Sequence, residues 1–132
     1  MRNRNSIAVS VLVLCALLAA PIAWTGEASQ VTSPTQYWFC QSSTVPPAYT
    51  STIVVTVASG GTKESILQAL AATKRDIEHS FADFLAKTYG YTGISSCLNN
   101  ESRYWMESYR NERLETLRTH NLQIVEIDWK YQ

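Results

Sequence analysis

The stretch Tyr49-Thr50-Ser51-Thr52-Ile53-Val54-Val55-Thr56-Val57 alternates between apolar and hydroxyl side chains. Tyr49, Ile53, Val55 and Val57 share one parity, whereas the threonines at positions 50, 52 and 56 share the other. Because successive side chains of a strand point to opposite faces, this pattern predicts a half-buried strand with a threonine-rich outer face.

A second, aromatic strand is predicted just upstream, from Tyr37 to Ser42. The segment from Ser43 to Ala48 contains Pro46-Pro47, which favours a loop. The two strands should therefore pair as a hairpin through this proline loop.

A long helix is predicted next. Thr62 can cap it, no glycine or proline follows until it ends near Lys87, and Gly90 is a suitable left-handed C-cap. Its apolar stripe follows steps of three or four residues: Ile66, Leu70, Thr73, Ile77, Phe81, Phe84 and Thr88.

A second helix is predicted from about Glu101 to Thr119, after a connection from Gly93 to Asn100 and a cap at Asn99 or Asn100. Its inner side is expected to be Trp105, Met106, Tyr109, Arg113 and Leu117. The segment from Gln123 to Tyr131 then alternates again, with Val125, Ile127, Trp129 and Tyr131 on one face of a last strand.

The element order is thus strand, strand, helix, helix, strand. It predicts an α+β fold, a two-layer sandwich in which a three-stranded, largely antiparallel sheet is covered on one face by two helices. We expect one domain over residues 37–132, preceded by a flexible lead over residues 29–36.

The N-terminus is typical of a bacterial secretory signal peptide. Arg2 and Arg4 precede an almost uncharged apolar run from Ile7 to Ala23, too short for a membrane span of about 20 residues. Cleavage is expected after Ala28, or alternatively after Ala23. The predicted location is therefore secreted or periplasmic, with membrane attachment only if the signal is left uncleaved.

Removal of residues 1–28 would leave two cysteines, Cys40 and Cys97. An even count in an exported chain favours one disulfide between them. The alternatives are a metal site and a reactive thiol, but neither cysteine has Cys-x-x-Cys spacing or a histidine nearby.

From Ser29 onward the chain carries nine Lys/Arg and ten Asp/Glu residues. The absence of a basic surplus argues against nucleic acid as a partner. The glycine-rich segment Ser59 to Lys63 lacks the spacing of a P-loop and is interpreted as a turn that caps a helix.

The two histidines, His79 and His120, are the candidates for acid–base catalysis. Asp76, His79 and Asp83 share one helix face with Glu78 beside them, but that face lies opposite the apolar stripe and should be solvated. His120 follows the second helix, where a cation complements the helix dipole. We therefore assign no catalytic residue, no metal ligand and no cofactor.

Aromatic residues provide the remaining functional hint. The first strand is apolar on both faces, so one of its aromatic sets could be exposed for binding. The predicted interaction surface consists of Tyr37, Trp38, Trp129 and Tyr131.

The pattern also resembles a family of small exported proteobacterial proteins of unknown function. The shared pieces are Tyr37-Trp38-Phe39-Cys40, Tyr49-Thr50-Ser51, a helix ending in Phe84 and Tyr89-Gly90, Cys97, and a last strand from Val125 to Trp129. The resemblance implies a periplasmic location and an α/β fold, and it implies no activity and no catalytic residues.

The leading functional hypothesis is a non-enzymatic binding or accessory module whose partner is an envelope or extracellular protein or glycan. One alternative is a small periplasmic hydrolase with a site assembled from distant residues. The other is an inhibitor or immunity-type protein.

Overall fold

The computed structural model describes residues 34–43 and 46–132. The predicted signal peptide, both cleavage sites and most of the predicted lead lie outside the described residues. The elements are β1 (Thr35–Ser42), β2 (Ala48–Ser51), β3 (Val54–Val57), α1 (Lys63–Tyr89), β4 (Ser95–Asn100), α2 (Arg103–Thr119) and β5 (Ile124–Ile127). The α+β class is confirmed, and β1 begins two residues before the predicted start at Tyr37.

Strand β1 lies at the centre of a five-stranded mixed sheet. It pairs along one edge with β4, and along the other edge first with β3 and then with β2, in each case antiparallel. Strand β5 is added parallel to β2. The prediction of three largely antiparallel strands is therefore wrong in strand number and in the direction of the last strand.

The stretch from Tyr49 to Val57 is not one regular strand. Trp38 faces Val54, but Gln41, three residues further along β1, faces Thr50, four residues back along the partner. One extra residue therefore lies between β2 and β3, as in a β-bulge.

The bulge reverses the side-chain parity that the alternation predicted. Tyr49 is buried as expected, but Val54 is also buried, whereas Val55 and Val57 are 55% and 64% exposed. Thr50 is fully buried and does not form part of a wet outer face. A one-residue shift in a strand moves every later side chain to the opposite face, which explains the error.

Serine hydroxyls stabilise the pairing on both sides of this irregularity. The Cys40 N–H donates to Ser51 Oγ at 2.9 Å, and Ser51 Oγ donates to the Thr52 carbonyl oxygen at 2.7 Å. The Tyr49 N–H donates to Ser42 Oγ at 2.9 Å. Buried backbone groups that lose regular ladder partners are thus satisfied by side chains.

The connection that the sequence analysis expected between the helices contains strand β4. All six of its residues pair with β1, and Cys97 lies directly opposite Cys40. The predicted Cys40–Cys97 disulfide is present, with a Cα–Cα distance of 4.1 Å. Strand β4 contains no β-branched or aromatic residue, so its sequence gives no strand-like pattern from which it could be predicted.

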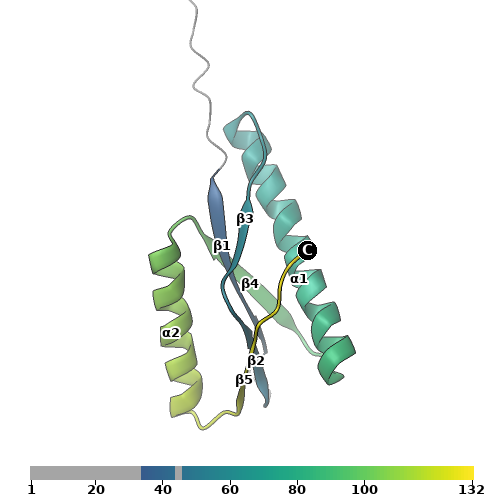
Figure 1. Cartoon of the computed structure of the whole chain (residues 1–132), viewed down its shortest axis with the longest axis vertical. Coiled ribbons are helices and arrows are strands. Elements are labelled where there is room, and N and C mark those ends of the chain that lie inside the picture. The colour runs from purple at the N-terminus through teal and green to yellow at the C-terminus, as the bar shows by residue number, and fades with distance from the viewer. Residues whose placement is uncertain (1–33, 44–45) are drawn as a thin grey trace, which may run out of the picture.

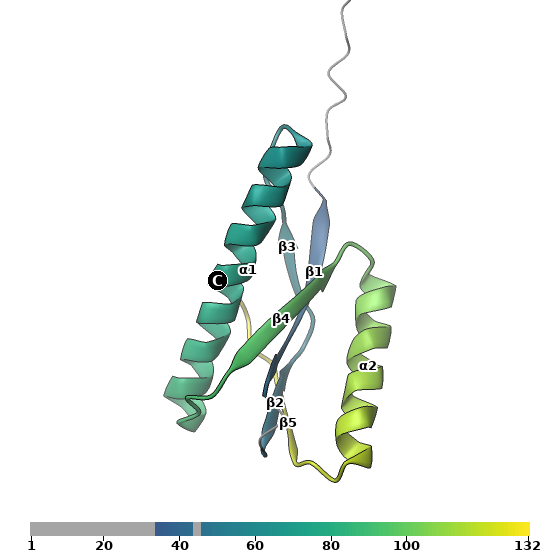
Figure 2. The ribbon, with the colours of Figure 1, turned by 180° about the vertical axis from the view of Figure 1, so that it is seen from behind.

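The helices lie on opposite faces of the sheet, as Figure 1 and the reverse view in Figure 2 both show. On the α1 face, Trp38 and Cys40 form one core cluster with Ile77, Phe81 and Leu85. On the α2 face, Phe39 contacts Tyr109 edge-on, with ring centroids 6.2 Å apart. The prediction that both helices cover one face is therefore wrong.

Strand direction explains this arrangement. Because β4 runs parallel to β3 and to β5, α1 and α2 each connect two parallel strands, and they cross the sheet in opposite directions. Crossovers of one hand that run in opposite directions place their helices on opposite faces. The result is a three-layer sandwich with the sheet in the middle.

The helix ends largely follow the predictions. Thr62 caps α1 in a reciprocal arrangement with Ser65, and Gly90 ends it with a φ of 66°. Helix α2 starts at Arg103 after a cap by Ser102, so the predicted start at Glu101 and the cap at Asn99 or Asn100 are wrong. Asn100 Oδ1 instead accepts a hydrogen bond from the Ser102 N–H at 2.8 Å.

We predict that replacing both Cys40 and Cys97 with alanine lowers the free energy of unfolding by about 4 kcal/mol, because the disulfide closes a long loop of the unfolded chain. Urea unfolding monitored by circular dichroism would measure it. The reduced wild-type protein is the control and should match the double variant; an unchanged unfolding midpoint would contradict the prediction.

We predict that Ser51→Ala lowers the free energy of unfolding by about 1–3 kcal/mol, because it removes the acceptor of the Cys40 N–H inside the sheet. Ser108→Ala, at an exposed position of α2, is the matched control and should change stability by less than about 0.5 kcal/mol. Equal effects of the two substitutions in thermal unfolding would refute this role of Ser51.

Candidate functional site: an aromatic shelf between α2 and β4

The structure does not assemble the predicted interaction surface. Trp38 is fully buried, Trp129 is 5% exposed, and both belong to the core cluster on the α1 face. Trp38 Nε1 donates to Thr56 Oγ1 at 2.8 Å, and the Trp129 ring lies 5.1 Å from that of Phe81. These two tryptophans are core residues, and their assignment to a binding surface is wrong.

Tyr37 and Tyr131 are only half-buried, but they lie on different faces. Tyr37 shares the α2 face of β1 with Phe39, whereas Tyr131 contacts Trp129 on the α1 face, at a centroid distance of 6.3 Å. The four predicted residues therefore form no common surface.

A different aromatic group is exposed at the junction of α2 and β4. The rings of Trp105 and Tyr109, one helical turn apart, stack at 5.4 Å with an interplanar angle of 7°. Leu98 of β4 and Tyr109 line the same shallow hollow of about 170 Å³, together with Phe39, Gln41 and Ser96. Trp105 is 45% exposed and Leu98 is 39% exposed. We call Leu98, Trp105 and Tyr109 the aromatic shelf.

Contacts between α2 and the sheet hold the aromatic shelf in place. Tyr109 packs edge-on against buried Phe39, and Arg113 Nε donates to Gln41 Oε1 at 2.9 Å one turn further along α2. Buried Met106, Leu114 and Leu117 hold the helix against the sheet. The aromatic shelf thus joins α2 to β4, and the Cys40–Cys97 disulfide links β4 to the central strand β1.

The prediction for the inner side of α2 was correct only in part. Met106 and Leu117 are buried as expected, but Leu114 is buried as well, and Trp105, expected on the inner side, is half-exposed. Met106, Leu114 and Leu117 form the buried stripe, and at 100° per residue Trp105 lies about 130° from the centre of that stripe. The i, i+4 spacing of Trp105 and Tyr109 was the available signal for the shelf.

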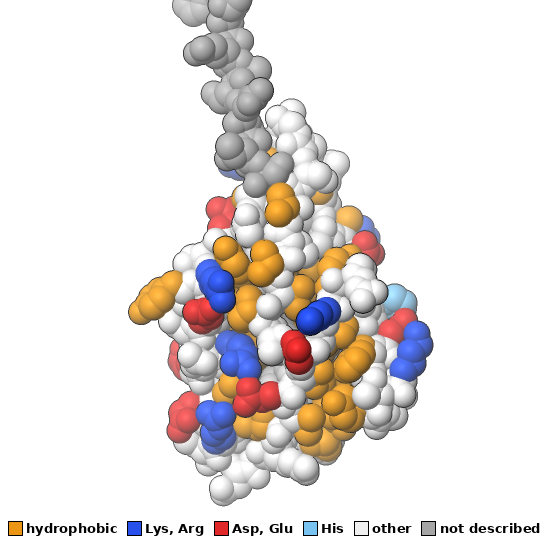
Figure 3. All heavy atoms as spheres, in the orientation of Figure 1, with side chains coloured by type: hydrophobic (Ala, Val, Ile, Leu, Met, Phe, Trp, Pro, Cys, Tyr) orange, Lys and Arg blue, Asp and Glu red, His pale blue; other side chains and the backbone are white. Residues whose placement is uncertain are grey.

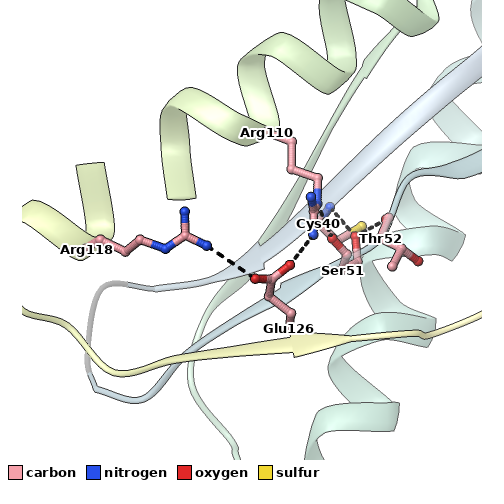
Figure 4. Close-up of polar contacts among 6 residues, drawn as sticks. All are labelled: Cys40, Ser51, Thr52, Arg110, Arg118 and Glu126. Carbon is pink, nitrogen blue, oxygen red and sulfur yellow. Dashed lines mark hydrogen bonds and ion pairs between the residues drawn. The ribbon is translucent and has the colours of Figure 1, made fainter. Parts of the chain in front are cut away.

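A network of arginine side chains links α2 to β2 and β5. Arg110 Nε donates to the Ser51 carbonyl oxygen at 3.1 Å, and its terminal nitrogen binds Glu126 of β5. Figure 4 shows that Arg118 approaches the other oxygen of the same carboxylate. Because the Arg110 side chain is only 18% exposed, this network is largely structural.

The remaining candidates have structural or solvated surroundings. His79 Nε2 lies 3.7 Å from Asp83 Oδ2 with both side chains well exposed, and Asp76 lines the same open groove beside Trp129 and Tyr131. Glu78 accepts the Cys97 N–H at 3.1 Å. His120 Nδ1 lies 2.7 Å from the Thr116 carbonyl oxygen at the end of α2.

The glycine-rich turn is a helix cap, as expected. A side chain at Gly60 would approach Ser65 Oγ to 2.7 Å, so glycine is required for the close approach of the capping box. Within residues 34–43 and 46–132, no group of three potential metal ligands is brought together. In the same part of the chain, neither helix is both long and apolar enough to cross a bilayer.

We predict that Arg110→Lys lowers the free energy of unfolding by about 1–2 kcal/mol, because an ammonium group cannot replace the guanidinium fork between Ser51 and Glu126. Arg103→Lys is the matched control on the same helix. Arg103 pairs with Glu107 at the surface, and the hydrogen bond that its Nε donates to the Glu107 carboxylate raises the pKa of the guanidinium. Thermal unfolding should distinguish the two variants, and a measurable loss from the control alone would contradict the prediction.

Comparison with known proteins adds no family to this description: no family model, curated protein or solved structure matches the chain.

Proposed function

We propose that this protein is a non-enzymatic exported binding module of the cell envelope, and that it binds an envelope or extracellular protein or glycan through the aromatic shelf. The observation that carries the proposal is the stacked, half-exposed pair of Trp105 and Tyr109 beside exposed Leu98. The disulfide is consistent with an oxidising compartment.

The shelf has the properties of a binding hot spot. Tryptophan and tyrosine contribute large contact areas at little conformational cost, especially where packing already fixes their rings. Trp105 is fixed by Tyr109, which is itself fixed by Phe39. A flat ring supported in this way suits either the apolar face of a sugar or an aliphatic side chain of a protein.

The surface charge supports recognition by shape and stacking. Figure 3 shows acidic and basic side chains interspersed on the visible face, without a large patch of one sign. The whole chain has a formal net charge of zero, with 11 basic and 11 acidic residues. Recognition of a partner mainly through long-range electrostatic attraction is therefore not expected.

We predict that Trp105→Ala weakens binding of envelope glycans or of a captured envelope protein at least about tenfold, as expected for a hot-spot aromatic residue. Tyr104→Ala is the matched control, because Tyr104 is 81% exposed on the same helix and its ring is not part of the stacked pair of Trp105 and Tyr109. Binding would be measured by calorimetry, with a panel of cell-wall fragments and with proteins captured from an envelope extract.

Equal losses from Trp105→Ala and Tyr104→Ala, or binding that survives both substitutions, would refute the shelf as the binding surface. A captured partner that proves to be an enzyme inhibited in a one-to-one complex would identify the module as an inhibitor or immunity-type protein.

The hydrolase alternative has one observation in its favour. The open groove of about 520 Å³ between α1 and the chain end brings His79, Ser80 and Asp83 beside Trp129 and Tyr131. The side chains of His79 and Asp83 are both well exposed, so water competes for their hydrogen bonds. Hydrolysis of a panel of esters and amides that is abolished by His79→Ala but not by His120→Ala would favour this alternative.

A further inference from the structure

The outer edge of β3 differs from the other two outer edges of the sheet. At the β4 edge, the outward N–H of Cys97 is bound by the Glu78 carboxylate of α1. At the β5 edge, Glu126 and its two arginine partners place charges along the strand. Charges and covering helices are the usual protection of edges against unwanted strand pairing.

The backbone of β3 offers hydrogen-bonding groups to a further strand. The bond from the Ala58 N–H to the Pro34 carbonyl oxygen, at 3.1 Å, sets the alternation along the β1–β3 ladder. Thr56 and Val54 therefore face β1 with their N–H and C=O groups, whereas the same groups of Val55 and Val57 point outward. Within the described residues, these outward groups have no hydrogen-bond partner.

The described residues that follow β5 do not pair with β3. The Thr52 N–H donates to the Ile127 carbonyl oxygen at 3.0 Å, and β5 ends at that residue. The following residues turn toward α1, as Figure 1 shows, and Trp129 enters the core there. A hollow of about 310 Å³ then separates β3 from the chain end.

The side chains along the edge are apolar and uncharged. Val55 and Val57 are 55% and 64% exposed, and the sequence carries no charged residue between Glu27 and Lys63. In Figure 3, hydrophobic side chains reach the surface in the upper part of the molecule, where Figure 1 places β3. An open, β-branched edge strand with no charged residue of its own favours pairing with a further strand.

We propose that β3 pairs antiparallel with β3 of a second copy of this chain, about a two-fold axis that places Val55 of each copy opposite Val57 of the other. Each such pair exchanges two hydrogen bonds, so the contact makes four. The four valines lie on one face of the joined sheet and shield one another from water.

The charges near the edge favour a second copy as the occupant. Asp128 and Lys130 are the charged residues that line the hollow beside β3, one of each sign. A two-fold contact repeats the same neutral combination on both sides and requires no opposite charge from a foreign partner. The edge is also its own complement, because the two outward residues of one copy match those of the other.

The test is sedimentation velocity of the purified, oxidised protein over a range of concentrations. The wild-type protein should sediment as a dimer, and Val55→Lys and Val57→Lys should each be monomeric, because they introduce like charges across the ladder. Leu67→Lys is the matched control: Leu67 is 57% exposed on α1 and is not part of the β3 edge strand, and this variant should remain dimeric. Circular dichroism would show that all three variants are folded.

Amide hydrogen exchange provides a readout specific to the edge. Exchange of the Val55 and Val57 amides should slow as protein concentration rises, whereas the Val54 and Thr56 amides, already bonded to β1, should not change. A monomer at every concentration, a dimer that survives both lysine substitutions, or a dimer without added protection at Val55 and Val57 would overturn the proposal. Protection that appears only with an added foreign peptide would also overturn it and assign the edge to a different partner.

Discussion

The disulfide between Cys40 and Cys97 joins two residues that face each other across β1 and β4, and the arrangement of the sheet depends on that contact. The residues of β4 are mostly serine and asparagine, which favour turns over strands. Such a segment gains little from its own propensity. Its stability as a strand comes from the covalent link, from the full six-residue pairing with β1, and from the Glu78 carboxylate that binds its outward N–H.

Because β4 is a strand, each helix becomes a crossover between parallel strands. Helix α1 carries the chain across the sheet to β4, and α2 carries it back to β5, so the two helices cover different faces. If residues 95–100 were only a connection, the helices would form a hairpin over one face and the other face of β1 would be wet. Because a helix covers each face of the sheet, Trp38 and Phe39 are both buried although they lie on opposite faces of β1.

The predictable part of this protein was local. The buried parity of residues 125–131, the stripe of α1, its cap at Thr62 and its end at Gly90 all follow from side chains close in sequence, although the last strand ends at Ile127 and not at the predicted Tyr131. The bulge beside Ser51 could not be predicted in this way. It depends on the register between β1 and two partner segments, and it exposed Val55 and Val57, which the alternation had assigned to the core. The candidate site was misplaced for a related reason, because Trp38 is buried under α1 and Phe39 on the opposite face beside α2, whereas Trp105 lies on α2 away from its buried stripe.

The sequence by itself determined the elements that rest on short-range periodicity, the α+β class, and the pairing of the only two cysteines in residues 34–43 and 46–132. The tertiary structure alone decided the strand character of residues 95–100, the parallel addition of β5 and the separation of the helices onto two faces. It also decided which aromatic and β-branched side chains remain at the surface. The physical reason is that burial depends on what covers a face, and the covering elements come from parts of the chain far apart in sequence, whose pairing no local pattern records.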